Sequence, residues 1–116
     1  MENCVVGNIV VRPPSYKEHT TVEGQSYTIP CDTTVDADVR WFFKSLFSVS
    51  GYSRTLYDQG RIWEHFRPRF SLNTSVHLLY GLDISNVQLN DAGNYTCIDG
   101  VGQGDEHIHN LIVQGT

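Results

Sequence analysis

The stretch Asp91-Ala92-Gly93-Asn94-Tyr95-Thr96-Cys97 decides how the rest of this chain is interpreted. Residues 90–93 are turn formers, and the segment behind them alternates, so that Tyr95 and Cys97 share one face of a strand. Asn94 and Thr96 occupy the opposite, polar face. The stretch therefore predicts a strand that begins directly after a turn and is buried on one side only.

The cysteine spacing indicates a disulfide. Cys31 stands 66 residues before Cys97, and the sequence has no Cys-x-x-Cys pair, which disfavours a metal knuckle. A disulfide indicates an oxidising compartment, so we expect an extracellular protein, at the cell surface or secreted. Cys4, which we expect to precede the first strand, is then free, bonded to another chain, or bonded to a residue outside this sequence.

The period-two pattern recurs along the chain. Apolar residues alternate in segments 25–31, 39–43, 82–87 and 111–113, and turn formers gather in segments 32–38, 48–53 and 100–104. No window keeps a helical period over three turns, although residues 61–66 fit one short turn. Many short strands with regular turns predict an all-β sandwich or barrel. Because the sequence shows no repeat or linker, we place residues 1–116 in one domain.

Composition narrows the possible partners. The chain has 116 residues, 40% of them hydrophobic and 18% charged, which suits a packed core. A formal net charge of -5 argues against a nucleic-acid partner, which would need clustered Lys and Arg. No stretch approaches the roughly 20 apolar residues that span a bilayer, and residues 1–11 lack the positive start of a signal peptide. We expect the parent protein to be membrane-anchored by a segment outside this sequence.

Enzyme chemistry finds little support. No Ser, Asp or Cys sits in a nucleophile motif, so we expect no catalytic residue and no cofactor. His107 and His109 share a strand face and offer two imidazoles for a metal, but no second pair of ligands is evident. We favour packed strand histidines without a bound metal.

Several further motifs occur in order. Trp41 follows Cys31 by ten residues, and Arg69-Phe70 precedes Leu82-x-Ile84 and the run Asp91-x-Gly93-x-Tyr95-x-Cys97. With a closing Leu111-x-Val113, these motifs resemble a V-set immunoglobulin domain over nearly the whole chain. The kinds of V domain that they are similar to occur in junctional adhesion molecules, nectins and antigen receptors.

The resemblance implies a two-sheet Greek-key sandwich of the V type, with a disulfide from Cys31 to Cys97 between the sheets and Trp41 packed on it. It implies a tyrosine corner at Tyr95 and an ion pair between Arg69 and Asp91 at the lower end of the sandwich. The 66-residue cysteine spacing favours the variable type. Residues 55–57 then form strand C′, and residues 61–66 form strand C″ or its replacement.

Residues 101–104 (Val-Gly-Gln-Gly) admit two interpretations. They resemble the Phe-Gly-x-Gly run of antigen-receptor joining segments, and they also fit the tip of a hairpin between strands F and G. We favour the hairpin, because residues 111–115 resemble the receptor ending as well, in an alignment that differs by several residues.

Two sequons indicate N-glycosylation: Asn73-Thr74-Ser75 and Asn94-Tyr95-Thr96. Asn73 is expected in the exposed turn between strands D and E. Asn94 is expected to point from the start of strand F onto the sheet that V domains use for contact, where a glycan would compete with pairing.

Strand parity predicts a binding surface. If Trp41 and Cys97 point into the core, their sequence neighbours point out of the C, C′, F and G sheet. The predicted partner-binding residues are Phe42, Lys44, Thr96, Ile98, Glu106, Ile108 and Asn110. An apolar centre with a charged rim marks a protein partner. Lys44 would repel its own copy in a symmetric pair, so we expect it to be offset or matched by a carboxylate such as Glu106.

These observations favour a recognition or adhesion module of an immune-type receptor, which forms a homodimer or pairs with another V domain. Two alternatives stay open: a structural spacer in a modular ectodomain, and a secreted immune protein that recognises microbial surfaces. Fold alone does not choose between them.

Overall fold

The computed structural model describes residues 4–6, 9–11, 14–31, 39–48, 51–73, 80–99 and 105–115. These residues form strands and two short 3-10 helices, namely β1 (Cys4–Val6), β2 (Ile9–Val11), β3 (Ser15–Val22), β4 (Tyr27–Ile29), β5 (Arg40–Ser45), β6 (Arg54–Asp58), β7 (Arg61–Ile62), η1 (Glu64–Phe66), β8 (Phe70–Asn73), β9 (Gly81–Ile84), η2 (Leu89–Asp91), β10 (Gly93–Asp99) and β11 (Asp105–Gln114). No helix among them is long and apolar enough to cross a membrane.

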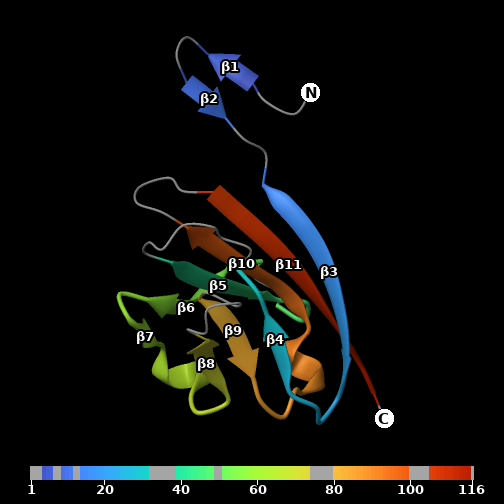
Figure 1. Cartoon of the computed structure of the whole chain (residues 1–116). Coiled ribbons are helices and arrows are strands. Elements are labelled where there is room, and N and C mark those ends of the chain that lie inside the picture. Colours follow the sequence, from blue (N-terminus) through green and yellow to red (C-terminus); the bar gives the residue numbers. More distant parts are fainter. Residues whose placement is uncertain are drawn as a thin grey trace.

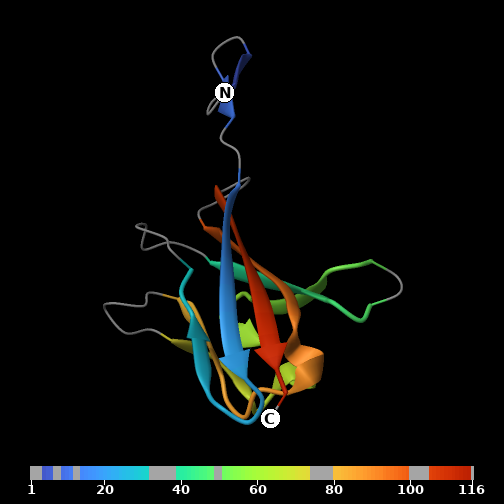
Figure 2. The ribbon, with the colours of Figure 1, turned by 90° about the vertical axis from the view of Figure 1, so that its right-hand side faces the viewer.

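Two sheets face each other to form a sandwich (Figure 1). The front sheet has the strand order β3-β11-β10-β5-β6-β7, and the back sheet has the order β4-β9-β8. β1 and β2 form a separate hairpin, which stands beyond the start of β3 and away from the sandwich (Figures 1 and 2). The structure thus has the predicted all-β, V-type immunoglobulin architecture.

The core is made by alternate residues of facing strands. Trp41, Tyr95 and Cys97 of the front sheet are fully buried, and so are Ile29 and Leu82 of the back sheet. Because successive strand residues point to opposite faces, these positions fix the inward side of both sheets. The alternation that the sequence shows in segments 25–31, 39–43 and 82–87 therefore corresponds to core strands.

The predicted disulfide joins the two sheets. Cys31 lies just after β4, Cys97 lies in β10, and their Cα atoms are 5.6 Å apart. Trp41 is the direct partner of Cys97 in the β5–β10 ladder, and its Nε1 donates a hydrogen bond to the carbonyl oxygen of Tyr80 at 2.8 Å. The indole thus packs beside the disulfide with its one polar group satisfied. Closure of so long a loop contributes about 4 kcal/mol in the chain-entropy model.

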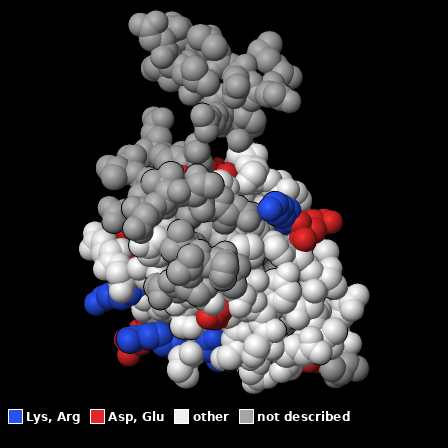
Figure 3. All heavy atoms as spheres, in the orientation of Figure 1, with Lys and Arg blue, Asp and Glu red and all other residues white. Residues whose placement is uncertain are grey.

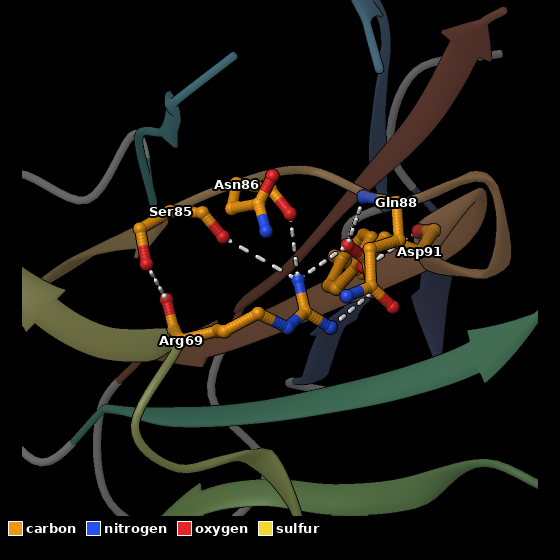
Figure 4. Close-up of polar contacts among 6 residues, drawn as sticks. Arg69, Ser85, Asn86, Gln88 and Asp91 are labelled. Atoms are coloured by element: carbon orange, nitrogen blue, oxygen red, sulfur yellow. Dashed lines mark hydrogen bonds and ion pairs between the residues drawn. The ribbon is translucent and has the colours of Figure 1, made fainter. Parts of the chain in front are cut away.

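An ion pair between Arg69 and Asp91 joins two segments at the lower end of the sandwich (Figure 4). The Arg69 guanidinium donates two hydrogen bonds to the Asp91 carboxylate, Nη1 to Oδ2 at 2.8 Å and Nη2 to Oδ1 at 2.9 Å. Asp91 Oδ2 also accepts the backbone N–H of Gln88 at 2.8 Å. The predicted ion pair is therefore present, and it ties the residue before β8 to η2.

Asp91 also anchors the predicted tyrosine corner. The Tyr95 hydroxyl donates a hydrogen bond to the backbone carbonyl of Asp91 at 2.6 Å. Burial of the ring, together with the nearby Asp91 charge, raises the pKa of Tyr95 far above its ordinary value. The hydroxyl therefore stays protonated and remains a donor at any physiological pH.

Three expectations need correction or refinement, and a fourth concerns residues outside the described part of the chain. Asn73 is the last residue of β8, not a residue of the following turn, because its pairing with Gly81 extends the ladder. Cys4 is the first residue of β1 and does not precede the first strand, because β1 and β2 pair as a hairpin. Residues 61–66 divide into the two-residue strand β7 and the single turn η1, and residues 101–104 lie outside the described part of the chain.

Gly93 sits where β10 approaches the end of β5 too closely for a side chain. Its φ is +148°, and an added Cβ would overlap the carbonyl oxygen of Lys44 and lie 2.8 Å from the backbone nitrogen of Leu46. Leu46 N–H donates to the carbonyl of Ala92 at 2.9 Å, so the backbone there has no room to move apart.

We expect Gly93→Ala to lower the free energy of unfolding by about 3 kcal/mol, because overpacked backbone adds to conformational strain. Gly24→Ala is the matched control: Gly24 has a φ of +92°, but an added Cβ there would have no atom within 4 Å, so only the dihedral cost of about 1 kcal/mol applies. Urea unfolding monitored by tryptophan fluorescence measures both. Equal losses in the two variants would contradict the steric account.

We expect Arg69→Gln to lower the free energy of unfolding by about 2–3 kcal/mol, because the Asp91 side chain, only 6% exposed, would keep its charge and lose its partner. Arg69→Lys should recover only part of the loss, since an ammonium does not form the two-pronged contact. Arg67→Gln, at an exposed neighbouring arginine, serves as the control and should change stability by less than about 0.5 kcal/mol. Similar urea midpoints for Arg69→Gln and Arg67→Gln would show that the ion pair contributes nothing.

Candidate functional site

The outward face of the front sheet brings the predicted partner-binding residues into three rows across β5, β10 and β11. The ladders pair each β10 residue with one residue on either side. From the upper to the lower end of the sheet, the rows are Arg40–Ile98–Glu106, Phe42–Thr96–Ile108 and Lys44–Asn94–Asn110. All seven predicted residues thus lie on one continuous surface, which we call the front face.

The burial pattern shows why these side chains point outward. Their sequence neighbours Trp41, Phe43, Tyr95 and Cys97 are buried, so the alternating positions must lie on the other side of the sheet. Lys44 and Glu106 are exposed, as predicted. The apolar members of the face, Phe42, Ile98 and Ile108, are half-buried, although strand parity alone predicted them to be exposed.

β3 widens this face beyond the predicted residues. It pairs in parallel with β11 over its whole length and places Tyr16 beside Ile108 and Glu18 beside Asn110. Tyr16 is 56% exposed, and its hydroxyl accepts a hydrogen bond from Nδ2 of Asn110 at 3.2 Å. Sequence reasoning missed Tyr16, because residues 15–22 (Ser-Tyr-Lys-Glu-His-Thr-Thr-Val) show no apolar alternation that would mark a strand.

Charges of opposite sign occupy opposite sides of the front face. Arg40 and Lys44 lie on β5, whereas Glu106 lies on β11 and Glu18 on the adjoining β3. β10 separates them and contributes the uncharged residues Asn94, Thr96 and Ile98. The face is therefore positive along one strand and negative along the other two.

His109 does not share a site with His107, although both point inward from β11. His109 is 1% exposed, and its Nδ1 lies 2.8 Å from Nε2 of His19, whose Nδ1 lies 2.7 Å from the Tyr27 hydroxyl. The His109 ring also packs on Trp41, with ring centroids 6.0 Å apart. These contacts fasten β3 and β11 to β4 of the back sheet.

His107 belongs to a separate polar array. Its Nε2 lies 2.9 Å from Oδ2 of Asp99, and its Nδ1 lies 3.0 Å from Oγ of Ser15. Within the described part of the chain, no three His, Cys, Asp or Glu side chains gather as a metal site requires. The imidazoles of His107 and His109 are thus both engaged in contacts between strands.

The array Ser15–His107–Asp99 contains the side chains of a hydrolase triad, but its setting differs. A serine nucleophile needs donors for a developing oxyanion and a pocket for the acyl group. Ser15 is the first residue of the regular strand β3, where it pairs with His107 of β11. Its geometry supports a bridge that joins the starts of β3 and β11 to the end of β10.

The asparagines of the two sequons lie on different sheets. Asn94 belongs to the lowest row of the front face, half-buried between Lys44 and Asn110. A glycan on Asn94 would cover that row. Asn73 lies on the back sheet, and its Nδ2 donates a hydrogen bond to Oδ1 of Asp83 at 3.2 Å.

Known proteins that are similar to this chain have the same immunoglobulin fold. The family model for the immunoglobulin V-set domain matches residues 15–114. No curated protein matches the chain by sequence. Among solved structures, the first Ig domain of the mouse polymeric immunoglobulin receptor is 23% identical, with a TM-score of 0.63 and coverage of 89% of this chain and 92% of that chain.

Two further solved structures are homodimers. The ZIG-8 IG1 homodimer is 17% identical, with a TM-score of 0.70 and coverage of 91% of this chain and 85% of that chain. The extracellular domain of the voltage-gated sodium channel beta4 subunit is 18% identical, with a TM-score of 0.64 and coverage of 91% and 97%. That subunit forms parallel homodimers, which explain its role in cell–cell adhesion. At these identities the likeness concerns the fold alone.

Proposed function

Because the chain belongs to the immunoglobulin V-set domain family, whose members are binding modules and not enzymes, we propose that it is an extracellular recognition or adhesion module. It pairs through the front face with a second copy of itself or with another V domain. We assign it to a membrane-anchored receptor of the immune type. The homodimers formed by ZIG-8 and by the sodium channel beta4 subunit support pairing as a use of this fold.

The charge separation on the front face is the observation that carries the proposal. In a two-fold symmetric pair, each contact occurs twice with the roles exchanged. If the axis runs roughly along β10, β5 of one copy faces β11 of the other copy and lies next to that copy's β3. The cations of β5 then meet the carboxylates of the partner's β11 and β3 on both sides of the axis. This arrangement resolves the repulsion that Lys44 would meet against its own copy.

The middle row supplies the apolar contact. Phe42 of β5, Thr96 of β10 and Ile108 of β11 form this row, which lies between the two rows that contain Arg40 and Lys44 and crosses the proposed axis. A rigid aromatic ring beside a β-branched residue forms a contact core from which water is excluded, while the charged rows form the rim. Asn94 lies on the rim, so a glycan there would oppose pairing.

We expect Phe42→Ala to weaken self-association by about 1 kcal/mol or more, because it removes the central aromatic group of the contact. Sedimentation equilibrium at high protein concentration measures this change. Phe47→Ala, at an exposed aromatic residue in the turn after β5, is the control and should leave association unchanged. If the unmodified protein is monomeric and binds no V-domain partner, pairing through the front face is wrong and the spacer function replaces it.

Charge reversal tests the orientation of the pair. We expect the double variants Arg40→Glu/Lys44→Glu and Glu18→Lys/Glu106→Lys each to lose self-association, since like charges would then face one another across the axis. An equimolar mixture of the two variants should form a heterodimer, because both sets of contacts become complementary. Glu64→Lys, at an exposed acidic residue of η1, is the control for net charge. Failure of the mixture to associate, while Glu64→Lys pairs normally, would exclude the proposed axis.

A further inference from the structure

A second surface lies away from the front face, where the turn between β5 and β6 meets η1 and η2. It encloses a depression of about 410 Å³, which we call the turn pocket. Phe43 and Phe66 form its floor, with ring centroids 6.2 Å apart and nearly perpendicular planes. Phe43 is stacked on the buried Tyr95 ring at 4.4 Å, so the floor is the edge of the rigid core.

The rim of the turn pocket is unusually apolar for exposed surface. Phe47 is 62% exposed and Tyr52 is 77% exposed, and both line the pocket. Leu46, next to Phe47 in the same turn, is 70% exposed. Large apolar side chains that gather at the surface mark a contact site for another molecule. Because this rim extends past the pocket itself, a small molecule in the pocket would leave much of it uncovered.

The charge of the turn pocket contrasts with that of the chain. Arg54 lines it, because its register opposite Phe43 places it on the inner side of the front sheet at the open edge. Its Nη1 lies 3.4 Å from Nε2 of His65, another lining residue. No carboxylate is among the described residues that line the pocket. In a chain of net charge -5, this is a local site for a negative group.

Further basic side chains lie on the face of the molecule that Figure 3 shows. Lys and Arg side chains gather at the lower left of Figure 3, over the region that β6, β7 and η1 occupy in Figure 1, beside smaller acidic groups.

We propose that the turn pocket binds a segment of a partner protein that inserts one aromatic side chain and carries a carboxylate next to it. The volume is at the small end of the range for binding pockets and suits a single large side chain. The inserted ring packs on Phe43 and Phe66, the neighbouring carboxylate pairs with Arg54, and the partner's backbone lies across Phe47 and Tyr52. This surface is separate from the front face, so one domain engages two partners at once.

Titration of the ¹⁵N-labelled domain with a capped tetrapeptide, acetyl-Ala-Phe-Glu-Ala-amide, tests the proposal. Its neutral twin carries Gln in place of Glu. We expect amide shifts in the β5–β6 turn and η1, and a Kd about threefold lower for the Glu peptide, the preference that one exposed ion pair gives. Arg54→Gln should abolish the preference for the Glu peptide over the Gln peptide, and Phe47→Ala should weaken the binding of both peptides. Neither Arg54 nor Phe47 is buried, so both variants should fold.

Two control variants separate this surface from others. Arg61→Gln removes an exposed arginine of β7 that does not line the pocket, and it should leave the preference intact. Phe42→Ala changes only the front face and should bind the peptide normally, so failure of pairing and failure of the turn pocket are distinguishable. Absence of shifts at the turn, or equal affinity for the two peptides, would overturn the proposal. Binding of 3-phenylpropionate as tight as that of the Glu peptide would assign the pocket to a small organic acid and overturn it as well.

Discussion

The geometry of this domain depends on the link between β10 and the back sheet. The disulfide from Cys97 to Cys31 fixes one residue of β10 as inward, and Trp41 stands beside it in the next strand. Because a strand has a period of two, one inward residue determines the orientation of every other residue in β10 and, through the ladders, in β5 and β11. A slip of one residue would turn the front face into the core. The covalent bond therefore specifies the binding surface as well as the stability of the sandwich.

At the lower end of the sandwich, hydrogen bonds of Asp91 also constrain the position of β10. Asp91 accepts hydrogen bonds from Arg69 and from the Gln88 backbone, and its own carbonyl accepts one from Tyr95. Gly93 then lets β10 begin directly against the end of β5. Together these contacts set where β10 starts, and the disulfide sets which way it faces. A V domain needs both, because a start shifted by one residue would also change the rows of the front face.

The two surfaces differ in the physics of recognition. The front face spans several strands, with half-buried apolar residues in its middle and separated charges at its sides, and it suits a second sheet. The turn pocket is small, opens onto the aromatic core and presents one arginine among aromatic rings, and it suits a single inserted side chain. Both surfaces include the same strand, β5, because consecutive residues point to opposite faces of the sheet: Phe42 belongs to the front face and Phe43 to the turn pocket.

The sequence by itself determined the parity of the strands, the cysteine pairing, the contact of Arg69 with Asp91 and the outward position of seven residues on the front face. Those follow from local alternation and from motifs whose members lie at fixed positions in the fold. Only the tertiary structure decided that β3 lies parallel to β11, that His109 meets His19 rather than His107, and that Phe47, Arg54 and His65 surround one pocket. The physical reason is that β-sheet register is set by packing between segments far apart in the chain. The sequence of a strand such as β3, which has no apolar alternation of its own, does not indicate which strand it pairs with.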